Sequence, residues 1–398
     1  MSGSALIYVQ YLLGIGHLQR SRWIAEALAR EGVAVTLVCG GEPISGLTGH
    51  PAIRFVQLEP VRARDARFEL IDRGGNPLDD ALRERRRAAL LDAFAAAKPD
   101  AVVIEGFPFA RRAFRFELDP LIAAVRASQP RPRLICSVRD IIVMRDDPAR
   151  HRWVLERVRA DFDALLVHGD SEFIPFEASF PAAAEIADRL VYTGYVAAPA
   201  EPPAPGPRDP GGEVIVSGGG GPAGWMLLAA ALQARKQGCL PDSPWRLLTG
   251  ANLAEDDFAA LSRAAPTGVT IERFRHDFRS LLRGCRVSVS QAGYNTVLDV
   301  LAARARAVLV PFAAERETEQ LLRAEKLAAS GAAELVRESD LSPESLARAI
   351  ERAAAREPIS VAIDADGAAR SARLIAAMIH DDGSAPGFAV GSGRSIIS

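Results

Sequence analysis

The sequence predicts an α/β protein built from two doubly wound parallel sheets, each in its own domain. The chain has 398 residues, 48% of them hydrophobic, which is more than one ordinary core accommodates. Short apolar runs alternate with helical patterns from end to end, and this alternation is typical of βαβ units. A proline-rich stretch from Val196 to Gly212 interrupts the alternation and predicts a linker.

The first series of elements opens with "ALIYVQYLL", which we interpret as a buried strand. The next segment, "HLQRSRWIAEALAREG", predicts a helix, because Trp23, Ile24, Ala27 and Leu28 share one helical face before Gly32. Further strands are predicted at "VAVTLVCGG", "IRFVQLEP", "AVVIEGF", "RLICSVRD" and "ALLVHGD". The second series has strands at "EVIVSGGGG", "WRLLTG", "VTIERF", "VSVSQAG", "AVLVPF" and "AAELV".

These patterns predict the domain boundaries. We expect an N-terminal domain over residues 1–196, a linker over 197–212, a C-terminal domain over 213–364, a helix over 365–380 and a flexible tail over 381–398. Ligands of open α/β sheets bind beyond the carboxyl ends of the strands. We therefore expect the two sheets to face each other across a cleft lined by these strand ends.

Composition excludes several classes of protein. The formal net charge is −2, so the basic face of a nucleic-acid-binding protein is not expected. The four cysteines lie far apart and predict neither a zinc site nor a disulfide framework. No run of eighteen apolar residues and no signal peptide are present in the sequence. We expect a protein of the reducing cytoplasm.

The first strand is followed by "GIGH", in which Gly14 and Gly16 permit a sharp turn and His17 stands where a helix begins. A neutral imidazole titrates near pH 6.5 and can act as a general base on an acceptor hydroxyl. Two alternatives stay open: His17 binds a phosphate, or it only fills the turn. Glu117 and Asp140 are rival candidates for the base, and we expect Gly14, Gly16, Glu117 and Asp140 to bind the acceptor.

Two glycine-containing turns mark the second series. "SGGGG", Ser217 with Gly218, Gly219, Gly220 and Gly221, follows a strand and opens a helix, which suits contact with a diphosphate. A structural strand-to-helix turn is the alternative. "SQAGYNTVLD" ends another strand and places Asp299 inside the following helix, where a carboxylate could accept the two ribose hydroxyls of a nucleotide. A solvated helix residue is the alternative there.

The stretch "SQAGYNTVLD", with "VLVPF" and "ETEQLLRAEKLAASGAA" after it, resembles the nucleotide-sugar domain of MurG-like glycosyltransferases. These enzymes add N-acetylglucosamine to a lipid-linked peptidoglycan precursor. The resemblance covers roughly residues 213–336, and in the N-terminal half only "GIGH" is similar. It implies the GT-B fold, which has two Rossmann-like domains around a cleft, and metal-independent chemistry with no bound cofactor.

The resemblance also implies site residues. Those of the donor site are Ser217, Gly218, Gly219, Gly220 and Gly221 at the diphosphate, Phe274 and Arg275 at the base, Ser290, Gln291, Gly293, Asn295, Thr296 and Asp299 at the nucleotide, and Glu319 and Gln320 at the sugar hydroxyls. His17 takes the place of the family's N-terminal loop histidine. Three residues depart from the family pattern: Gln291 replaces an Arg, Glu319 a Gln and Arg323 an Asn. These departures leave the base and the sugar of the donor open.

We therefore expect an inverting glycosyltransferase that moves a sugar from a nucleotide-diphospho-sugar, with UDP as the expected nucleotide, to an acceptor hydroxyl. The acceptor would be a cell-envelope or lipid-linked glycan. A nucleotide-sugar hydrolase or epimerase on the same fold is the alternative, and a non-catalytic nucleotide-sugar binder is a third. The Phe- and Arg-rich segment 105–121 either packs into the core or touches an anionic lipid surface, with peripheral association at the inner face of the cell membrane.

Overall fold

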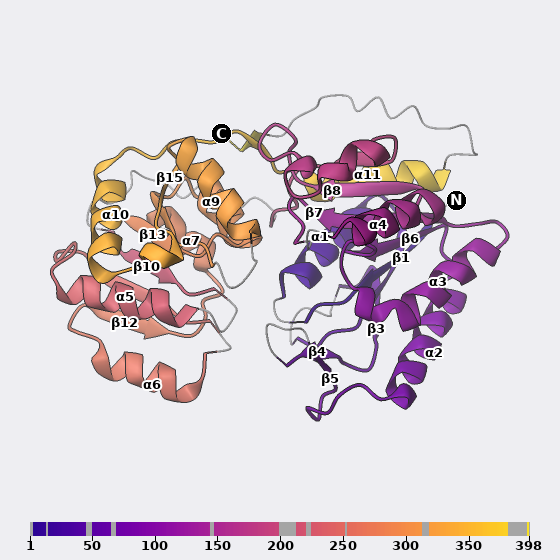
Figure 1. The fold of residues 1–398 in the computed structure, drawn as a ribbon, viewed down its shortest axis with the longest axis horizontal. Helices are drawn as coiled ribbons and strands as arrows, with labels where there is room; N and C mark the ends of the chain where they lie inside the picture. The colour runs from indigo at the N-terminus through magenta and orange to yellow at the C-terminus, as the bar shows by residue number, and fades with distance from the viewer. Residues whose placement is uncertain are drawn as a thin grey trace. The chain divides into compact units, whose positions relative to one another are not determined.

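The computed structural model describes residues 3–12, 15–44, 50–64, 69–143, 147–198, 212–219, 224–250, 253–312, 318–380 and 396–397. The chain divides into two compact units (Figure 1). Unit 1 holds Met1–Ala197 and Asp364–Ile396, and unit 2 holds Ala198–Ile363 and Ile397–Ser398. Each unit is built on its own parallel sheet, so the predicted fold class is confirmed.

Unit 1 is centred on a seven-stranded parallel sheet in the order β3-β2-β1-β6-β7-β8-β9. Its strands are β1 (Ser4–Val9), β2 (Ala34–Cys39), β3 (Ile53–Gln57), β6 (Ala101–Glu105), β7 (Arg133–Arg139), β8 (Ala164–His168) and β9 (Leu190–Tyr192). A short hairpin, β4 (Arg62–Ala63) with β5 (Leu70–Ile71), lies outside this sheet. The strand order reverses between β1 and β6, and this switch point is where a doubly wound sheet offers a crevice for a ligand.

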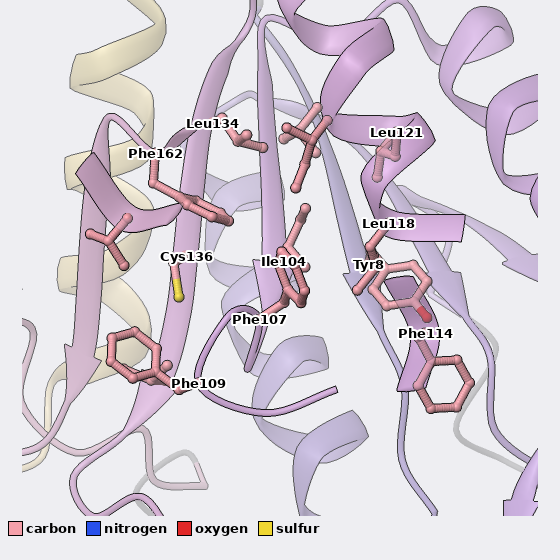
Figure 2. Close-up of a cluster of buried hydrophobic side chains, with 14 of the residues drawn as sticks. Tyr8, Ile104, Phe107, Phe109, Phe114, Leu118, Leu121, Leu134, Cys136 and Phe162 are labelled. Carbon is pink, nitrogen blue, oxygen red and sulfur yellow. The ribbon is translucent and has the colours of Figure 1, made fainter. Parts of the chain in front are cut away.

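Helices cover both faces of this sheet because alternate strand residues point to opposite sides. Along β1, Leu6 and Tyr8 enter one core, while Ala5, Ile7 and Val9 enter the other. The first core is shared with α2 (Asp80–Ala97), α3 (Arg115–Ala127) and α4 (Pro148–Asp161), and Figure 2 shows part of it. The second core is shared with α1 (Gly16–Arg30) and α11 (Gly367–His380).

The last helix is therefore part of unit 1, although unit 2 precedes it in the sequence. Helix α11 packs beside α1 (Figure 1). Its approach is fixed by backbone hydrogen bonds from Tyr195 N to Asp364 O, 2.6 Å, and from Gly367 N to Tyr195 O, 3.1 Å. A Cβ on Gly367 would lie 2.4 Å from Gly194 O, so the close approach of the two segments requires a glycine there.

Unit 2 is centred on a six-stranded parallel sheet in the order β12-β11-β10-β13-β14-β15. Its strands are β10 (Val214–Ser217), β11 (Trp245–Leu248), β12 (Val269–Glu272), β13 (Val287–Ser290), β14 (Ala307–Leu309) and β15 (Ala333–Leu335). The helices of unit 2 are α5 (Trp225–Lys236), α6 (Glu255–Ala264), α7 (Phe278–Gly284), α8 (Tyr294–Ala302), α9 (Glu319–Ala329) and α10 (Pro343–Ala355). A two-stranded pairing joins β16 (Ile363–Asp364) to β17 (Ile396–Ile397). The switch point of this sheet lies between β10 and β13.

The first strand is shorter than its apolar run predicts, because Gln10 turns away from the ladder after Val9. Gln10 is fully buried, and its Nε2 donates to Tyr11 O at 2.9 Å and Val61 O at 3.0 Å. Its Oε1 accepts from Arg86 Nη2 at 2.8 Å. A buried polar side chain within an apolar run therefore ends this strand.

A buried ion pair lies between β1 and the helices on its first face. Arg86 on α2 and Glu117 on α3 are both inaccessible, with Arg86 Nη2 2.7 Å from Glu117 Oε1 and Arg86 Nε 2.9 Å from Glu117 Oε2. The Tyr8 hydroxyl donates to Glu117 Oε1 at 2.5 Å. The prediction that Glu117 binds the acceptor is wrong, since both its oxygens are used inside the core.

We expect Arg86→Met to lower the free energy of unfolding by about 3–5 kcal/mol, because the Glu117 carboxylate would stay buried without its partner. Chemical denaturation of the purified protein measures this change. Arg85→Met is the matched control, since Arg85 pairs with Glu59 on the surface and is more than half exposed. Equal effects of the two substitutions would contradict the structural role of the buried pair.

Candidate functional site

The unit 2 switch point brings together the two predicted donor turns. Ser217 ends β10 and Ser290 ends β13, and the two residues are directly paired across the strands. Gly219 has a φ of +76°, and a Cβ there would lie 2.9 Å from Gln291 Oε1. The two turns are therefore in contact at residues 219 and 291. Gly220 and Gly221 lie outside the described residues.

The glycine turn folds tightly back on the start of α5. A Cβ on Gly224 would lie 2.5 Å from Gly218 O, so the backbone of these two glycines touches without room for a side chain. This close contact explains why positions 218 and 224 are occupied by glycine. It also places the first backbone N–H groups of α5 beside the turn, where an anion is stabilised by the helix N-terminus.

The second turn leads into α8, with Gly293 as its N-cap residue. Two buried polar atoms here have no hydrogen-bond partner among the described residues: Ser290 Oγ and Asn295 Oδ1. Thr296 is half-buried in the first turn of the helix. Unpaired buried polar atoms are costly, so the turn is chemically suited to a polar ligand.

Asp299 lies two turns into α8 and is about a fifth exposed. Its Oδ1 lies 3.1 Å from Nε of Arg279 on α7. This ion pair fixes the carboxylate at the surface of α8.

Glu319 and Gln320, at the start of α9, make contacts within the protein. Glu319 is 2% exposed, and its Oε1 lies 3.1 Å from Nη2 of the equally buried Arg323. Arg323 Nη1 donates to Ala292 O at 2.8 Å. Gln320 Oε1 accepts from Ala292 N and from Phe312 N, each at 3.1 Å. Both backbone groups of Ala292 are thus held by α9, which we call the Ala292 clamp.

The Ala292 clamp changes the roles expected for this pair of residues. Burial of Glu319 against Arg323 argues against a direct contact between its carboxylate and a sugar hydroxyl. The side-chain oxygen of Gln320 already joins the end of β14 to the turn after β13. Gln320 holds the turn after β13 directly, and Glu319 does so through Arg323.

Phe274 and Arg275 follow β12. The Phe274 side chain is 59% exposed and stacks edge-on against His276, with ring centroids 4.9 Å apart. Arg275 is held at the surface by Asp277, at 2.7 Å. An exposed aromatic ring beside the strand ends is available to stack on a planar ligand.

The unit 1 switch point brings His17, at the start of α1, against Glu105, the last residue of β6. His17 Nδ1 lies 2.6 Å from Glu105 Oε1, and Arg20 Nη2 lies 2.6 Å from the same oxygen. Because the carboxylate accepts, we assign the neutral ring as the Nδ1–H tautomer, which leaves the Nε2 lone pair free to accept a proton. The ring is 24% exposed. Gly16 begins the helix, and Gly14 lies outside the described residues.

Burial lowers the pKa of His17 to about 3, and the nearby charges of Arg111 and Arg139 lower it further, while Glu105 opposes them. An unperturbed imidazole titrates near pH 6.5, so this site disfavours the protonated ring of His17. The main physical reason is desolvation, since a buried ring would have to carry its charge away from water, and the charges of Arg111 and Arg139 add to this cost. His17 is neutral across the physiological range.

Glu105 is the site residue that sequence reasoning missed. Burial raises its pKa, but the hydrogen bond from His17 and the charges of Arg111 and Arg20 lower it well below the usual range. The sequence feature that could have indicated Glu105 is its position as a carboxylate at the end of the apolar run in "AVVIEGF". A charged residue that ends a buried strand at the switch point is placed to meet the residue after β1.

Asp140 follows β7 and is fully buried. The Tyr195 hydroxyl donates to its Oδ2 at 3.1 Å, and a Cβ on Gly169 would lie 2.7 Å from the Asp140 Cβ. Asp170, in the "VHGD" segment, accepts from Asp364 N at 3.1 Å. Burial argues against Asp140 as an acceptor-binding group, and these residues hold the β8 end against the segment that leads to α11.

The aromatic residues of segment 105–121 belong to the core. Phe107, Phe109 and Phe114 are at most 1% exposed (Figure 2). The Arg112 guanidinium lies 5.0 Å from the ring centroid of Trp153. These three phenylalanines are not available to a lipid surface. None of the helices in the described part of the chain is long and apolar enough to cross a membrane.

The family comparison concerns the unit that carries the two donor turns. Residues 219–375 match the glycosyltransferase family 28 C-terminal domain. The chain carries a family 28 glycosyltransferase C-terminal domain. Within the described residues, no group of three His, Cys, Asp or Glu side chains is placed to hold a metal ion.

Curated relatives extend this likeness beyond the domain. A protein of Brucella anthropi named UDP-N-acetylglucosamine–N-acetylmuramyl-(pentapeptide) pyrophosphoryl-undecaprenol N-acetylglucosamine transferase is 34% identical over 143 residues, which are 35% of this chain and 38% of that protein. The chain thus aligns with about two fifths of that relative's length. A protein of the same name from Phenylobacterium zucineum is 26% identical over 353 residues, 85% of this chain and 86% of that protein. The chain is a distant homologue of these proteins.

Solved structures give the fold of the whole chain. The crystal structure of MurG from Acinetobacter baumannii matches with a TM-score of 0.56 and 18% identity, over 94% of this chain and 99% of that one. Together with the two parallel sheets, this likeness gives the chain the GT-B fold. The resemblance proposed from the sequence is confirmed at the level of family and fold.

We expect Gln320→Ala to weaken the binding of free UDP and of a UDP-sugar by the same factor, about tenfold, because Ala292 N and Phe312 N would lose their shared acceptor. Calorimetric titration with both ligands measures the two affinities. Glu325→Gln is the control, since Glu325 lies on the same helix and pairs at the surface with Arg337. A loss confined to the UDP-sugar would instead favour a direct contact between Gln320 and the sugar.

Proposed function

We propose that the protein is an inverting glycosyltransferase that moves a sugar from a UDP-sugar to an acceptor hydroxyl. The observation that carries the proposal is the pairing of two turns, residues 217–219 and 290–293, at the switch point of a family 28 domain. N-acetylglucosamine is the sugar that the names of the relatives suggest. A cell-envelope or lipid-linked glycan, met at the inner face of the membrane, is the acceptor class that we propose on the same ground.

In this proposal the donor is held by unit 2. The backbone N–H groups of the glycine turn and the start of α5 bind the diphosphate, and Asp299 accepts from the ribose hydroxyls. Phe274 stacks on the base. Gln291 lies against Gly219 and so is placed at the meeting point of the two turns. The Ala292 clamp holds the backbone of this turn in place before the ligand binds, which lowers the ordering cost of binding.

The acceptor is activated by His17. Its Nε2 takes the proton of the acceptor hydroxyl as that oxygen forms a bond to the anomeric carbon of the sugar. The bond from the anomeric carbon to the diphosphate oxygen breaks, and the electron pair leaves with UDP. Glu105 is a positioning residue that fixes the ring tautomer and stabilises the imidazolium formed in the step. The glycine turn stabilises the charge that develops on the leaving diphosphate.

A nucleotide-sugar hydrolase or epimerase on the same fold remains the second candidate, because it would use the same donor turns. Incubation of the protein with a UDP-sugar alone separates the candidates. Stoichiometric release of UDP without acceptor would support the hydrolase, and a change of the sugar's configuration would support the epimerase. A requirement for an added acceptor supports the transferase.

We expect Asp299→Ala to weaken the binding of UDP by about ten- to a hundredfold, because a charge-assisted hydrogen bond contributes about 1.5–3 kcal/mol. Calorimetric titration of the folded variant measures the loss. Asp256→Ala is a suitable control, since Asp256 is an exposed acidic residue in the first turn of α6. Unchanged affinity in the Asp299 variant would remove this residue from the donor site.

We expect His17→Ala to lower kcat by about 10² to 10⁴ with little change in donor affinity, the usual range for loss of a general base. Because the pKa of His17 is about 3, kcat/KM of the wild type should show no loss from this group between about pH 8 and pH 5. Initial rates at varied acceptor concentration give both parameters.

The outcome for acceptor affinity decides between the two roles of His17. Retained kcat with a raised acceptor KM would make His17 a ligand of the acceptor. His50, which is half-buried just before β3, is changed to Ala as the control for a nonspecific effect.

A further inference from the structure

A buried arginine on α1 contacts both members of the His17–Glu105 pair. Arg20 follows His17 by three residues, and residues at this spacing share one side of a helix. Its Nη2 lies 2.6 Å from Glu105 Oε1 and 3.2 Å from His17 Nδ1. The imidazole and the guanidinium therefore meet at the same carboxylate oxygen.

The order of the strands brings this arginine to the carboxylate. Strands β1 and β6 are neighbours in the sheet, so Glu105 at the end of β6 lies against the first turns of α1, which follows β1. Arg20 is 1% exposed, and a buried guanidinium requires an anion beside it. An apolar side chain would fill the same volume without this requirement. Arg20 is therefore a costly residue at this place unless its charge has a role.

A carboxylate 2.6 Å from an imidazole has two effects on the ring. It accepts the Nδ1 proton and so selects the tautomer, and its negative charge favours protonation of the ring. A protonated His17 could not take a proton from an acceptor. The positive charge of Arg20 at the same oxygen opposes the second effect, while the hydrogen bond that selects the tautomer remains.

Other charged groups face the ring from neighbouring elements. Arg111, in the segment after β6, has its Nη2 3.5 Å from Glu105 Oε2, and the charge of Arg139 at the end of β7 acts on His17. Burial lowers the pKa of His17 to about 3, Glu105 opposes this change, and Arg111 and Arg139 add to it. Arg20 adds its charge at the oxygen that accepts from the ring.

We propose that Arg20 is a positioning residue for the base, which holds Glu105 against His17 and offsets its charge, so that the carboxylate orients the ring while the ring stays neutral. This inference rests on the proposed function for its link to catalysis, whereas the charge of the ring is measured without donor or turnover. In the transfer step the acceptor O–H bond breaks and a bond from Nε2 to hydrogen forms. The Nδ1 proton stays on the ring, since Arg20 stabilises Glu105 as a carboxylate.

The first test is a pH titration of the full chain, followed by proton and nitrogen NMR of the histidine rings. His17 is one of six histidines, and the His17→Gln variant assigns its signal. We expect a neutral Nδ1–H ring in the wild type between about pH 8 and pH 5. In Arg20→Met we expect the His17 midpoint to lie about one to three pH units higher, because the charge of Glu105 is no longer offset.

The rate is an independent readout of the same change. We expect kcat/KM of Arg20→Met to fall toward acid pH through the raised midpoint, since a protonated His17 is no base. At alkaline pH it should approach the wild-type value, because the ring is neutral there and Glu105 still selects its tautomer. A purely structural role of Arg20 would lower the rate by the same factor at every pH.

Further variants separate charge from folding. Arg20→Lys keeps a cation at this place on α1, so we expect its His17 midpoint to stay near that of the wild type. Arg22→Met is the matched control, since Arg22 lies on the same helix and pairs with Glu26 at 2.6 Å. Circular dichroism verifies each fold, and Arg20→Gln, which is polar and uncharged, replaces Arg20→Met if that variant does not fold.

Four results would overturn the role of Arg20. They are a His17 midpoint in Arg20→Met no higher than in the wild type, the same rise in Arg22→Met, the same rise in Arg20→Lys, and a rate lowered equally from acid to alkaline pH. A midpoint that rises in Arg20→Met alone, in a protein that transfers no sugar, would support the action of Arg20 on the ring and count against the proposed function alone.

Discussion

The Glu105 carboxylate is the interaction on which the chemistry of unit 1 depends. One oxygen, Oε1, lies 2.6 Å from both His17 Nδ1 and Arg20 Nη2, so a single buried charge orients the imidazole ring and neutralises a cation. Without it, His17 would have no acceptor to select its tautomer, and the neighbouring guanidinium groups would repel one another. The carboxylate is available there because β6 ends at Glu105 beside the turn that follows β1. The order of the strands therefore determines which charges meet at this site, because it places Glu105 beside His17 and Arg20.

In unit 2 the strand order likewise brings two turns together at the switch point, but the residues in these turns are of another kind. There the residues after the two central strands are mainly glycines and short polar side chains, which expose backbone N–H groups rather than charges. Unit 1 offers an imidazole, a carboxylate and arginines at the equivalent switch point. A backbone cradle suits a diphosphate that must leave after the reaction, whereas a fixed imidazole suits the removal of a proton. Two parallel sheets with the same kind of switch point therefore present different chemical groups, charged side chains in unit 1 and backbone N–H groups in unit 2.

Much of the fold could be predicted from the sequence, because alternation of apolar runs and helices depends on local periodicity. The strand at Val214–Ser217 and the helix at Gly16–Arg30 follow directly from such patterns. The site was less predictable. The role of Glu105 depends on strand order, and the burial of Glu117 depends on how α2 and α3 pack, and neither is encoded locally. The pKa of His17 is likewise set by its burial, and then by Glu105, Arg111 and Arg139, which are about a hundred residues away in the sequence.

The residues that depart from the family pattern make physical sense as a group. Arg323 buries a guanidinium to hold Ala292 O, and a buried guanidinium requires an anion, which Glu319 supplies one helical turn earlier. A glutamine at position 319 would leave Arg323 without that charge. At position 291, a glutamine rather than an arginine adds no further cation beside Ala292, the residue that Arg323 already holds. With these three residues the positive charge lies on α9, where Arg323 holds the turn after β13 through the backbone of Ala292.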